Sequence, residues 1–330
     1  MDEQLVQRYA PILRFDQAEN FFPMRVRDFV RLGSIHAIEA GKGFLYVPPG
    51  YASLEDLTLF AAPDHYVAFA DRRVLNEASA RAMEQLFAER GLAKGIDVDG
   101  LKRRVRERLE ATGVKLLNVF GTFHLPEEVL KLALARYVGL ATHRPRYYCR
   151  VVEAGAYRVL QYWYFYAYND FGSSHGGSND HEGDWESVSV YLEDDKPVWV
   201  MGSAHSSDGA AHRLAWAAAE LEKVGTQPVV YVAAGSHANY FSAALAPLEK
   251  GFLAGGTAIG GLDGEAWEPP GALTFPWFTA YRGRWGARQW DQWGDEIRDR
   301  FSGPPAGPKF NRDGSVREAW ERPLVYAGLV

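Results

Sequence analysis

The chain has 330 residues, of which 47% are hydrophobic and 24% charged, and its formal net charge is -6 at pH 7. This composition is that of an ordinary globular protein with enough chain to bury a large core. The negative charge provides no basic face of the kind that nucleic-acid binders carry, so we expect no nucleic-acid partner. The single cysteine, Cys149, excludes an internal disulfide framework and a cysteine-cluster metal site.

The N-terminal sequence MDEQLVQRYAPILRF has no basic region followed by an apolar region. The chain also has no uninterrupted apolar run of about 18 residues, the length that a transmembrane helix needs. We therefore expect a cytoplasmic protein without a transmembrane segment. Peripheral contact with a membrane is compatible with this sequence.

The pattern of apolar residues changes along the first half of the chain. Residues 1–70 mix short apolar runs with proline and glycine, as in 47-VPPG-50, which predicts short strands and loops. From about 73 to 140 apolar residues recur at helical spacing, and 125-LPEE-128 is a helix-start signal. We predict one domain, with a helical insertion at about 73–140 and a β-rich core formed by residues 1–70 and 147–330.

Two strands joined by a long loop are predicted in the second half. The stretch 157-YRVLQYWYFYAYND-170 is aromatic on both alternating faces, which indicates a central strand covered on both sides. A Gly/Ser/Asn-rich connection, 171-FGSSHGGSNDHEG-183, leads to a strand over 184–192. A loop of this length is usually functional or mobile.

The chain then turns back at 194-DDKP-197 into a predicted strand over 198–204. Residues 214–225 read as a helix, and a helix of about a dozen residues spans roughly 18 Å. Such a helix would return the chain across the sheet, so the strand over 228–237 would run in the same direction as 198–204. The ends of both strands would then lie beside the start of the strand at 184.

The strand at 184 opens with two carboxylates on its apolar face. Because strand residues alternate between faces, Asp184 and Glu186 share a face with Val188, Val190 and Leu192. An unpaired ionised carboxylate at the edge of an apolar interior is very costly. A metal ion, a basic side chain or a shared proton would each neutralise the pair.

Three histidines and another acid are expected at the same edge. His181 precedes the acids, His205 and His237 end two strands after small residues, and Asp170 ends the strand before the long loop. Imidazole and carboxylate groups together form a typical site for a divalent cation. The alternative is that His181 caps the loop while the acids accept backbone N–H groups or meet an arginine.

Several motifs in order resemble the vacuolar protein sorting-associated protein 62 family: 8-RYAPILRFDQAENFFP-23, 161-QYWYFYAYND-170, 181-HEGDWESVSVYL-192, 203-SAH-205, 228-PVVYVAAGSHANYF-241 and 282-RGRWG-286. The stretch 181-HEGDWE-186 is also similar to the His-x-x-Asp-Trp-Glu motif of the necrosis- and ethylene-inducing-like cytolysins. Those are secreted β-sandwich proteins that bind a divalent cation and sphingolipid sugar headgroups. We expect this chain to differ from them, because its N-terminal sequence shows no secretion signal and it contains one cysteine.

The cytolysin resemblance implies one divalent ion (Mg, Mn, Fe, Zn or Ca) on His181, Asp184 and Glu186. Asp170 is an approximate match to the upstream acid that completes that site in the cytolysins. The resemblance also implies the fold. We expect an α+β protein with an antiparallel, cytolysin-like β-sandwich core, the helical insertion and peripheral helices.

The leading functional hypothesis is a metal-dependent, hydrolase-like enzyme acting on an ester, phosphoester or glycosidic bond at the rim of the sandwich. The ion would activate water, while His205 or His237 would move protons. The alternative is a non-catalytic, metal-dependent binder of small molecules, sugars or lipid headgroups, with Trp185 as a platform, or a membrane-trafficking adaptor. Arg282 and Arg284, on one alternating face, would clamp an anionic ligand or form salt bridges with nearby acids.

Overall fold

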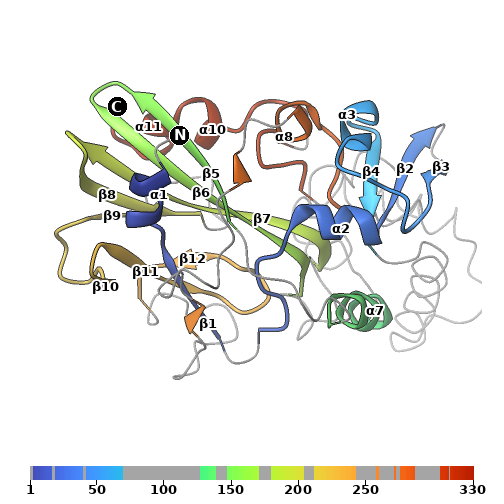
Figure 1. The fold of residues 1–330 in the computed structure, drawn as a ribbon, viewed down its shortest axis with the longest axis horizontal. Coiled ribbons are helices and arrows are strands. Elements are labelled where there is room, and N and C mark those ends of the chain that lie inside the picture. Colours follow the sequence, from blue (N-terminus) through green and yellow to red (C-terminus); the bar gives the residue numbers. More distant parts are fainter. Residues whose placement is uncertain are drawn as a thin grey trace, which may run out of the picture.

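The computed structural model describes residues 3–16, 19–39, 42–69, 127–138, 147–170, 180–203, 212–242, 258–259, 271–272, 276–286, 305–311 and 313–330. Figure 1 shows the arrangement of the helices and strands. The helices are α1 (Glu3–Arg8), α2 (Val26–Leu32), α3 (Asp56–Leu59), α7 (Glu127–Val138), α8 (Pro276–Ala280), α10 (Glu318–Glu321) and α11 (Pro323–Tyr326). The strands are β1 (Ile12–Phe15), β2 (Ser34–Glu39), β3 (Lys42–Val47), β4 (His65–Ala68), β5 (Tyr147–Ala154), β6 (Tyr157–Asn169), β7 (His181–Glu193), β8 (Lys196–Gly202), β9 (Arg213–Ala215), β10 (Lys223–Val224), β11 (Gln227–Val232), β12 (Asn239–Tyr240), β13 (Ala258–Ile259) and β14 (Gly271–Ala272).

The largest sheet contains six strands in the order β14-β5-β6-β7-β8-β9. Its long central strands β6 and β7 pair antiparallel, with Arg158 opposite Leu192 and Asn169 opposite His181. Asp194 and Asp195 form the turn between β7 and β8 with φ values of 48° and 59°. Positive φ at both central residues matches the twist of a two-residue hairpin. The predicted turn at 194–197 is therefore confirmed, and β7 begins three residues before the predicted start at 184.

A second sheet, in the order β10-β11-β1-β13 with β12 beside β11, faces the first. Side chains of β1 and β11 pack against the apolar faces of β6 and β7 in one buried cluster that includes Leu13, Phe15, Tyr162, Tyr164, Tyr166, Val188, Val190, Val230 and Val232. Two sheets that enclose a core between them form a β-sandwich. The predicted α+β class and mostly antiparallel β-sandwich core are confirmed.

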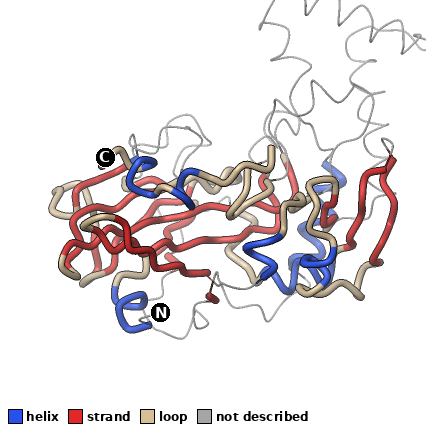
Figure 2. The backbone as a smooth tube through the Cα atoms, turned by 90° about the horizontal axis from the view of Figure 1, so that it is seen from above, coloured by secondary structure: helices blue, strands red, loops and turns tan. Residues whose placement is uncertain are grey.

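The other face of β6 and β7 is also buried, under an aromatic layer. Trp163, Phe165 and Trp185 pack there with residues of α2 and α8 and with Trp285. Because both faces are covered, β6 has apolar side chains at successive positions, as its sequence predicted. Figure 2 shows the helices near the two termini on opposite sides of the strands, which agrees with the predicted peripheral helices.

The helix predicted over 214–225 is wrong. The chain forms the short strands β9 and β10 in this stretch, and β9 pairs with β8 through Trp199 and Ala215. The guanidinium of Arg213 lies 4.7 Å from the ring centroid of Trp199, and Leu214 packs against the sandwich core. These contacts override the weak helical preference of an alanine-rich segment.

Residues 1–70 contain three short helices in addition to the predicted strands and loops. In α2 the buried residues Val26, Phe29 and Val30 face the core, and Phe29 stacks on Phe69 with ring centroids 4.9 Å apart. Of the helical insertion predicted at about 73–140, α7 is the described part, and the remainder lies outside the described residues.

No helix in the described parts of the chain combines the length and the apolar character needed to span a membrane.

Gly183 shapes the start of β7, between His181 and Asp184. Its φ is 61°, and a Cβ at this position would lie 1.9 Å from the backbone oxygen of Trp285. Gly225 has a similar φ of 60°, but an added Cβ there would meet nothing within 4 Å. Gly225→Ala should cost about 1–2 kcal/mol from backbone strain alone. Gly183→Ala should cost roughly 1–2 kcal/mol more because of overpacking.

Urea unfolding of both alanine variants and the wild type measures this difference. Equal losses at the two glycines would show that the close approach to Trp285 does not constrain position 183.

Candidate functional site

Three segments meet at one end of the sandwich. Since β1 and β11 are parallel, with Phe15 opposite Val232, the residues that follow these strands lie at the same edge. The end of β6 and the start of β7 lie at this edge as well, where the N–H of Asp170 donates to the carbonyl of Gly235. Among the described residues, all buried carboxylates belong to these segments: Asp16, Glu19, Asp170, Asp180, Glu182 and Asp184.

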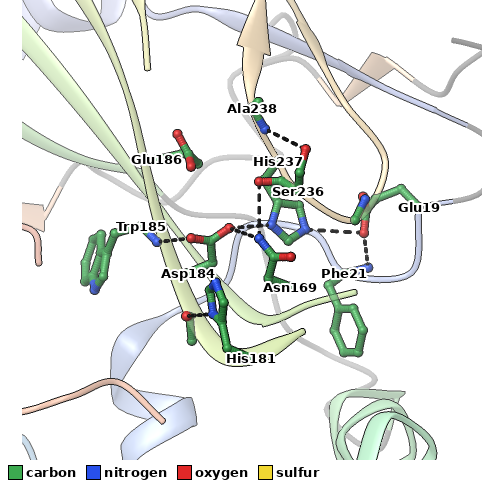
Figure 3. Close-up of polar contacts among 12 residues, drawn as sticks. Glu19, Phe21, Asn169, His181, Asp184, Trp185, Glu186, Ser236, His237 and Ala238 are labelled. Atoms are coloured by element: carbon green, nitrogen blue, oxygen red, sulfur yellow. Dashed lines mark hydrogen bonds and ion pairs between the residues drawn. The ribbon is translucent and has the colours of Figure 1, made fainter. Parts of the chain in front are cut away.

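The imidazole of His237 lies between two of these carboxylates (Figure 3). Its Nδ1 is 2.9 Å from Oδ2 of Asp184, and its Nε2 is 3.4 Å from Oε1 of Glu19. The side chain is fully buried, and its ring stacks on Tyr166 with 3.8 Å between the ring centroids. The expected meeting of His237 and Asp184 is therefore confirmed, although β11 reaches this edge in the second sheet and without the predicted helix.

The backbone also holds His237 in position. Its φ of 57° is in the left-handed region, which few residues other than glycine adopt. The N–H of His237 donates to the carbonyl of Ala233, and the N–H of Ala233 donates to the carbonyl of Ala238. A strained residue persists only where its surroundings determine it, and such residues concentrate at functional sites.

Glu19 is the member of this group that the sequence did not identify. Its Oε1 accepts the N–H groups of Asn20 and Phe21 at 2.9 and 2.7 Å, and its Oε2 accepts the N–H of Gly235 at 2.8 Å. Glu19 thus ties the segment after β1 to the loop after β11. The sequence does contain a signal for Glu19. Two acids, Asp16 and Glu19, follow a short apolar strand within the motif 8-RYAPILRFDQAENFFP-23.

Asp184 accepts hydrogen bonds at both carboxylate oxygens. Oδ1 accepts the N–H of Trp185 at 3.0 Å, and Oδ2 accepts the side-chain amide of Asn169 at 3.1 Å as well as the imidazole of His237. Asn169 ends β6, so the hydrogen bond joins the two central strands at the edge of the site. The carboxylate is consequently fixed in orientation.

Burial and charge act in opposite directions on the pKa values of this group. Burial alone would lower the pKa of His237, but the charge of Glu19 and the hydrogen bond to Asp184 raise it to about 10. Burial alone would raise the pKa of both carboxyl groups, whereas His237 holds each below its usual value. At neutral pH the site therefore contains an imidazolium between two carboxylates. The sequence left three ways to neutralise Asp184: a metal ion, a basic side chain or a shared proton. In the structure a basic side chain, His237, neutralises it.

His181 approaches Asp184 from the other side. Its Nδ1 lies 3.0 Å from the carbonyl oxygen of Gly183, and its ring points toward the carboxylate of Asp184 in Figure 3. A carbonyl oxygen only accepts hydrogen bonds, so Nδ1 carries the proton and a neutral ring has its lone pair on Nε2. Metal-binding histidines commonly have this arrangement.

Glu186 and Asp170 have other partners. The hydroxyl of Ser203 donates to Glu186, and the side-chain amide of Asn20 donates to Asp170 at 3.1 Å. Figure 3 shows the carboxylate of Glu186 apart from that of Asp184. In the described parts of the chain, no three His, Cys, Asp or Glu side chains are placed to share one metal ion. Imidazole and carboxylate are donor types that suit a divalent cation, and the ring of His181 faces the carboxylate of Asp184 in Figure 3.

The remaining predicted site residues are not gathered here. His205 lies outside the described residues. Trp185 is buried on the opposite face of β7 and packs against Phe165, Phe278 and Trp285, so it is not available to stack on a ligand.

The prediction that Arg282 and Arg284 share a face is also wrong. Arg282 is exposed, with its guanidinium 4.9 Å from the ring centroid of Phe310, whereas Arg284 is buried. The reason is that these residues lie outside the named strands: Arg284 forms a single bridge to Tyr66, and its N–H donates to the carbonyl of His65.

No protein-family model matches the chain, and no curated protein matches it. Among solved structures, similarity is found to Necrosis and Ethylene inducing Protein 2 from the causal agent of cocoa's witches' broom disease, with 18% identity, a TM-score of 0.25 and coverage of 29% of this chain and 45% of that chain. NLPPya in complex with glucosamine has 19% identity and a TM-score of 0.25, again over 29% of this chain and 45% of the other. NLPPya in complex with mannosamine has 22% identity and a TM-score of 0.23, over 29% and 44%.

The chain thus covers less than half the length of these structures. Because the TM-scores are far below 0.5, these similarities carry no conclusion about a ligand or an activity. The resemblance to the vacuolar protein sorting-associated protein 62 family stays a prediction.

Proposed function

We propose that this end of the sandwich binds a polar ligand rich in oxygen, such as a sugar or a lipid headgroup, with the help of a divalent cation at His181 and Asp184. The observation that carries the proposal is the orientation of His181, whose proton is held on Nδ1 by the carbonyl of Gly183 while its ring faces a fixed carboxylate. A divalent cation bound there would complete its coordination with hydroxyl or phosphate oxygens of the ligand.

Binding is better supported than hydrolysis. His237 is fully buried, and both of its ring nitrogens face carboxylates, so it is not placed to exchange protons with a ligand. A general acid or base must come within hydrogen-bonding distance of the reacting group. A catalytic role of His205 stays a prediction.

Asp184→Asn should reduce the amount of retained divalent metal by roughly tenfold or more, since one of the two proposed ligands loses its charge. Protein loaded separately with Mg²⁺, Mn²⁺, Fe²⁺, Zn²⁺ or Ca²⁺ is desalted and its metal content measured. The control is Glu222→Gln, which removes a carboxylate that pairs with Arg14 on the outside of the second sheet. Equal retention by the wild type and Asp184→Asn would exclude the metal assignment.

The metal-loaded wild type should also bind a soluble monosaccharide or phosphorylated headgroup more tightly than the metal-free protein. Calorimetric titration with a panel of both classes measures this difference. Turnover of an ester, phosphoester or glycoside by the same preparation, with loss in His205→Ala at unchanged metal content, would instead establish the hydrolase hypothesis.

A further inference from the structure

The sheet of β2, β3 and β4 lies at one end of the molecule, remote from both termini (Figure 1). Nine large hydrophobic residues of the described chain are exposed, and five of them lie within 44–59. These five include all of the exposed aromatic residues in the described parts of the chain. We call these residues the β3 patch: Phe44 at 45% exposure, Leu45 at 56%, Tyr46 at 45%, Tyr51 at 79% and Leu59 at 78%.

Phe44, Leu45 and Tyr46 of the β3 patch lie on a strand at the edge of this sheet. The sheet has the order β3-β2-β4, so β2 covers one side of β3, and no other described strand pairs with its outer side. The far side of β4, in contrast, is bridged by Arg284. A register shift beside Ile35 makes Tyr46 an extra residue in β3, and the edge from Lys42 to Leu45 is regular.

Three consecutive exposed residues, 44 to 46, mean that apolar side chains project from both faces of this edge. Edge strands usually carry charged residues or proline that prevent association, whereas a flat apolar edge favours pairing with another strand. In β3, KGFLYV, residue 42 is the one charged position.

The edge favours a protein strand over a membrane as the occupant. Backbone N–H and C=O groups along a strand edge cannot be satisfied in the hydrocarbon region of a bilayer, and each unsatisfied group costs several kcal/mol there. A second strand satisfies these groups and covers the apolar side chains on both faces at the same time.

We propose that β3 pairs antiparallel with β3 of a second copy of this chain, forming a twofold dimer. A twofold interface uses the same surface from both copies, so the surface must be complementary to itself. Pairing centred on Leu45 places Leu45 opposite the same residue of the second copy and Phe44 opposite Tyr46, so apolar residues face apolar residues. It also places residue 42 of the two copies at opposite ends of the ladder, so like charges do not face each other.

The area of the β3 patch is consistent with this assembly. Phe44, Leu45 and Tyr46, the patch residues on β3 itself, expose roughly 300 Å² if a large side chain has 150–250 Å² of surface. This is at the lower end of the range of about 300–600 Å² for the largest apolar patch on a monomer, which is often functional. It is over a third of the ~800 Å² that each partner contributes to a standard interface, and the strand edge itself adds further area.

Sedimentation velocity of the full chain over a concentration series tests the proposal, with the wild type expected to form a dimer. Leu45→Lys should raise the dissociation constant by roughly tenfold or more, because lysines replace apolar residues at the centre of the new pair. Val224→Lys is the matched control, since Val224 is 40% exposed on the edge strand of the other sheet. Circular dichroism verifies that both variants are folded.

Cross-linking provides an independent readout. Cys149 is the one cysteine of the chain and is buried, so Leu45→Cys introduces a single accessible thiol. A short bismaleimide should link Leu45→Cys, but not Val224→Cys, into a covalent dimer. A wild type that stays monomeric at every concentration, or a dimer that Leu45→Lys leaves intact, would overturn the proposal. A monomer that cosediments with phosphatidylcholine vesicles would assign the β3 patch to a membrane instead.

Discussion

Replacing His237 with alanine should lower the free energy of unfolding by about 3–5 kcal/mol, the usual cost of removing one partner of a buried ion pair. In this protein the substitution leaves two buried carboxylates, Glu19 and Asp184, without the imidazolium that lies between them. It also removes the ring that stacks on Tyr166. Equilibrium urea unfolding of the wild type and the variant measures the change.

Two further variants separate charge from packing. Glu222→Gln breaks the Arg14–Glu222 ion pair, whose side chains are 34% and 38% exposed, and should cost no more than about 1 kcal/mol. Adding Glu19→Gln to His237→Ala should restore part of the lost stability, because one of the two uncompensated charges is removed. A loss below about 1 kcal/mol in His237→Ala, or no recovery in the double variant, would contradict the role of His237 as an internal cation.

The β-sandwich core was predictable because its signals are local. The alternating residues of β7 fix one face to the sandwich interior, and the same period places Asp184 and Glu186 on that face. Aromatic residues occupy both alternating faces of β6, which predicted that both faces are buried, and both are buried in the structure. The turn at Asp194 and Asp195 follows from residues that tolerate positive φ.

The second sheet and its connections depend on contacts between distant residues. Residues 214–225 have a local preference for helix, but β9 gains hydrogen bonds from β8 and β10 gains them from β11. Short edge strands of this kind are determined by the partner strand and leave little signal in their own sequence.

The group that neutralises Asp184 could not be predicted either, because it also depends on contacts between distant residues. A metal ion, a basic side chain and a shared proton all require the same acids on the same face, so the local pattern is identical for the three. In the structure the partner is His237. The parallel pairing of β1 and β11 brings Glu19 and Gly235 together across 216 residues of sequence, and His237 follows Gly235 in the same loop. Because the local pattern is the same with or without a metal ion, binding of the proposed cation at His181 and Asp184 must be tested by experiment.

The stability of the protein should also decrease as the pH rises from 6.5 toward 10. Folding raises the pKa of His237 from 6.5 to about 10. The stabilisation from its charge is therefore complete below pH 6.5 and is lost as the pH rises through the folded-state pKa. The full loss would amount to roughly 4–5 kcal/mol, at 1.36 kcal/mol for each pKa unit. Glu19 and Asp184 act in the opposite direction, because folding lowers their pKa values from 4.5 and 3.8.

The contribution of these carboxylates is present above their unfolded pKa values and is lost as the pH falls, so the group as a whole stabilises the protein most between about pH 4.5 and 6.5. Urea unfolding at intervals from about pH 5 to 9 measures the profile below the range in which exposed tyrosines titrate. Tyr166, which stacks on His237, has its own pKa raised by burial and stays neutral in this range. In His237→Ala the decrease between pH 6.5 and 9 should disappear, whereas Glu222→Gln should retain it. If the wild type and His237→Ala give parallel profiles, His237 is not the imidazolium that neutralises Asp184.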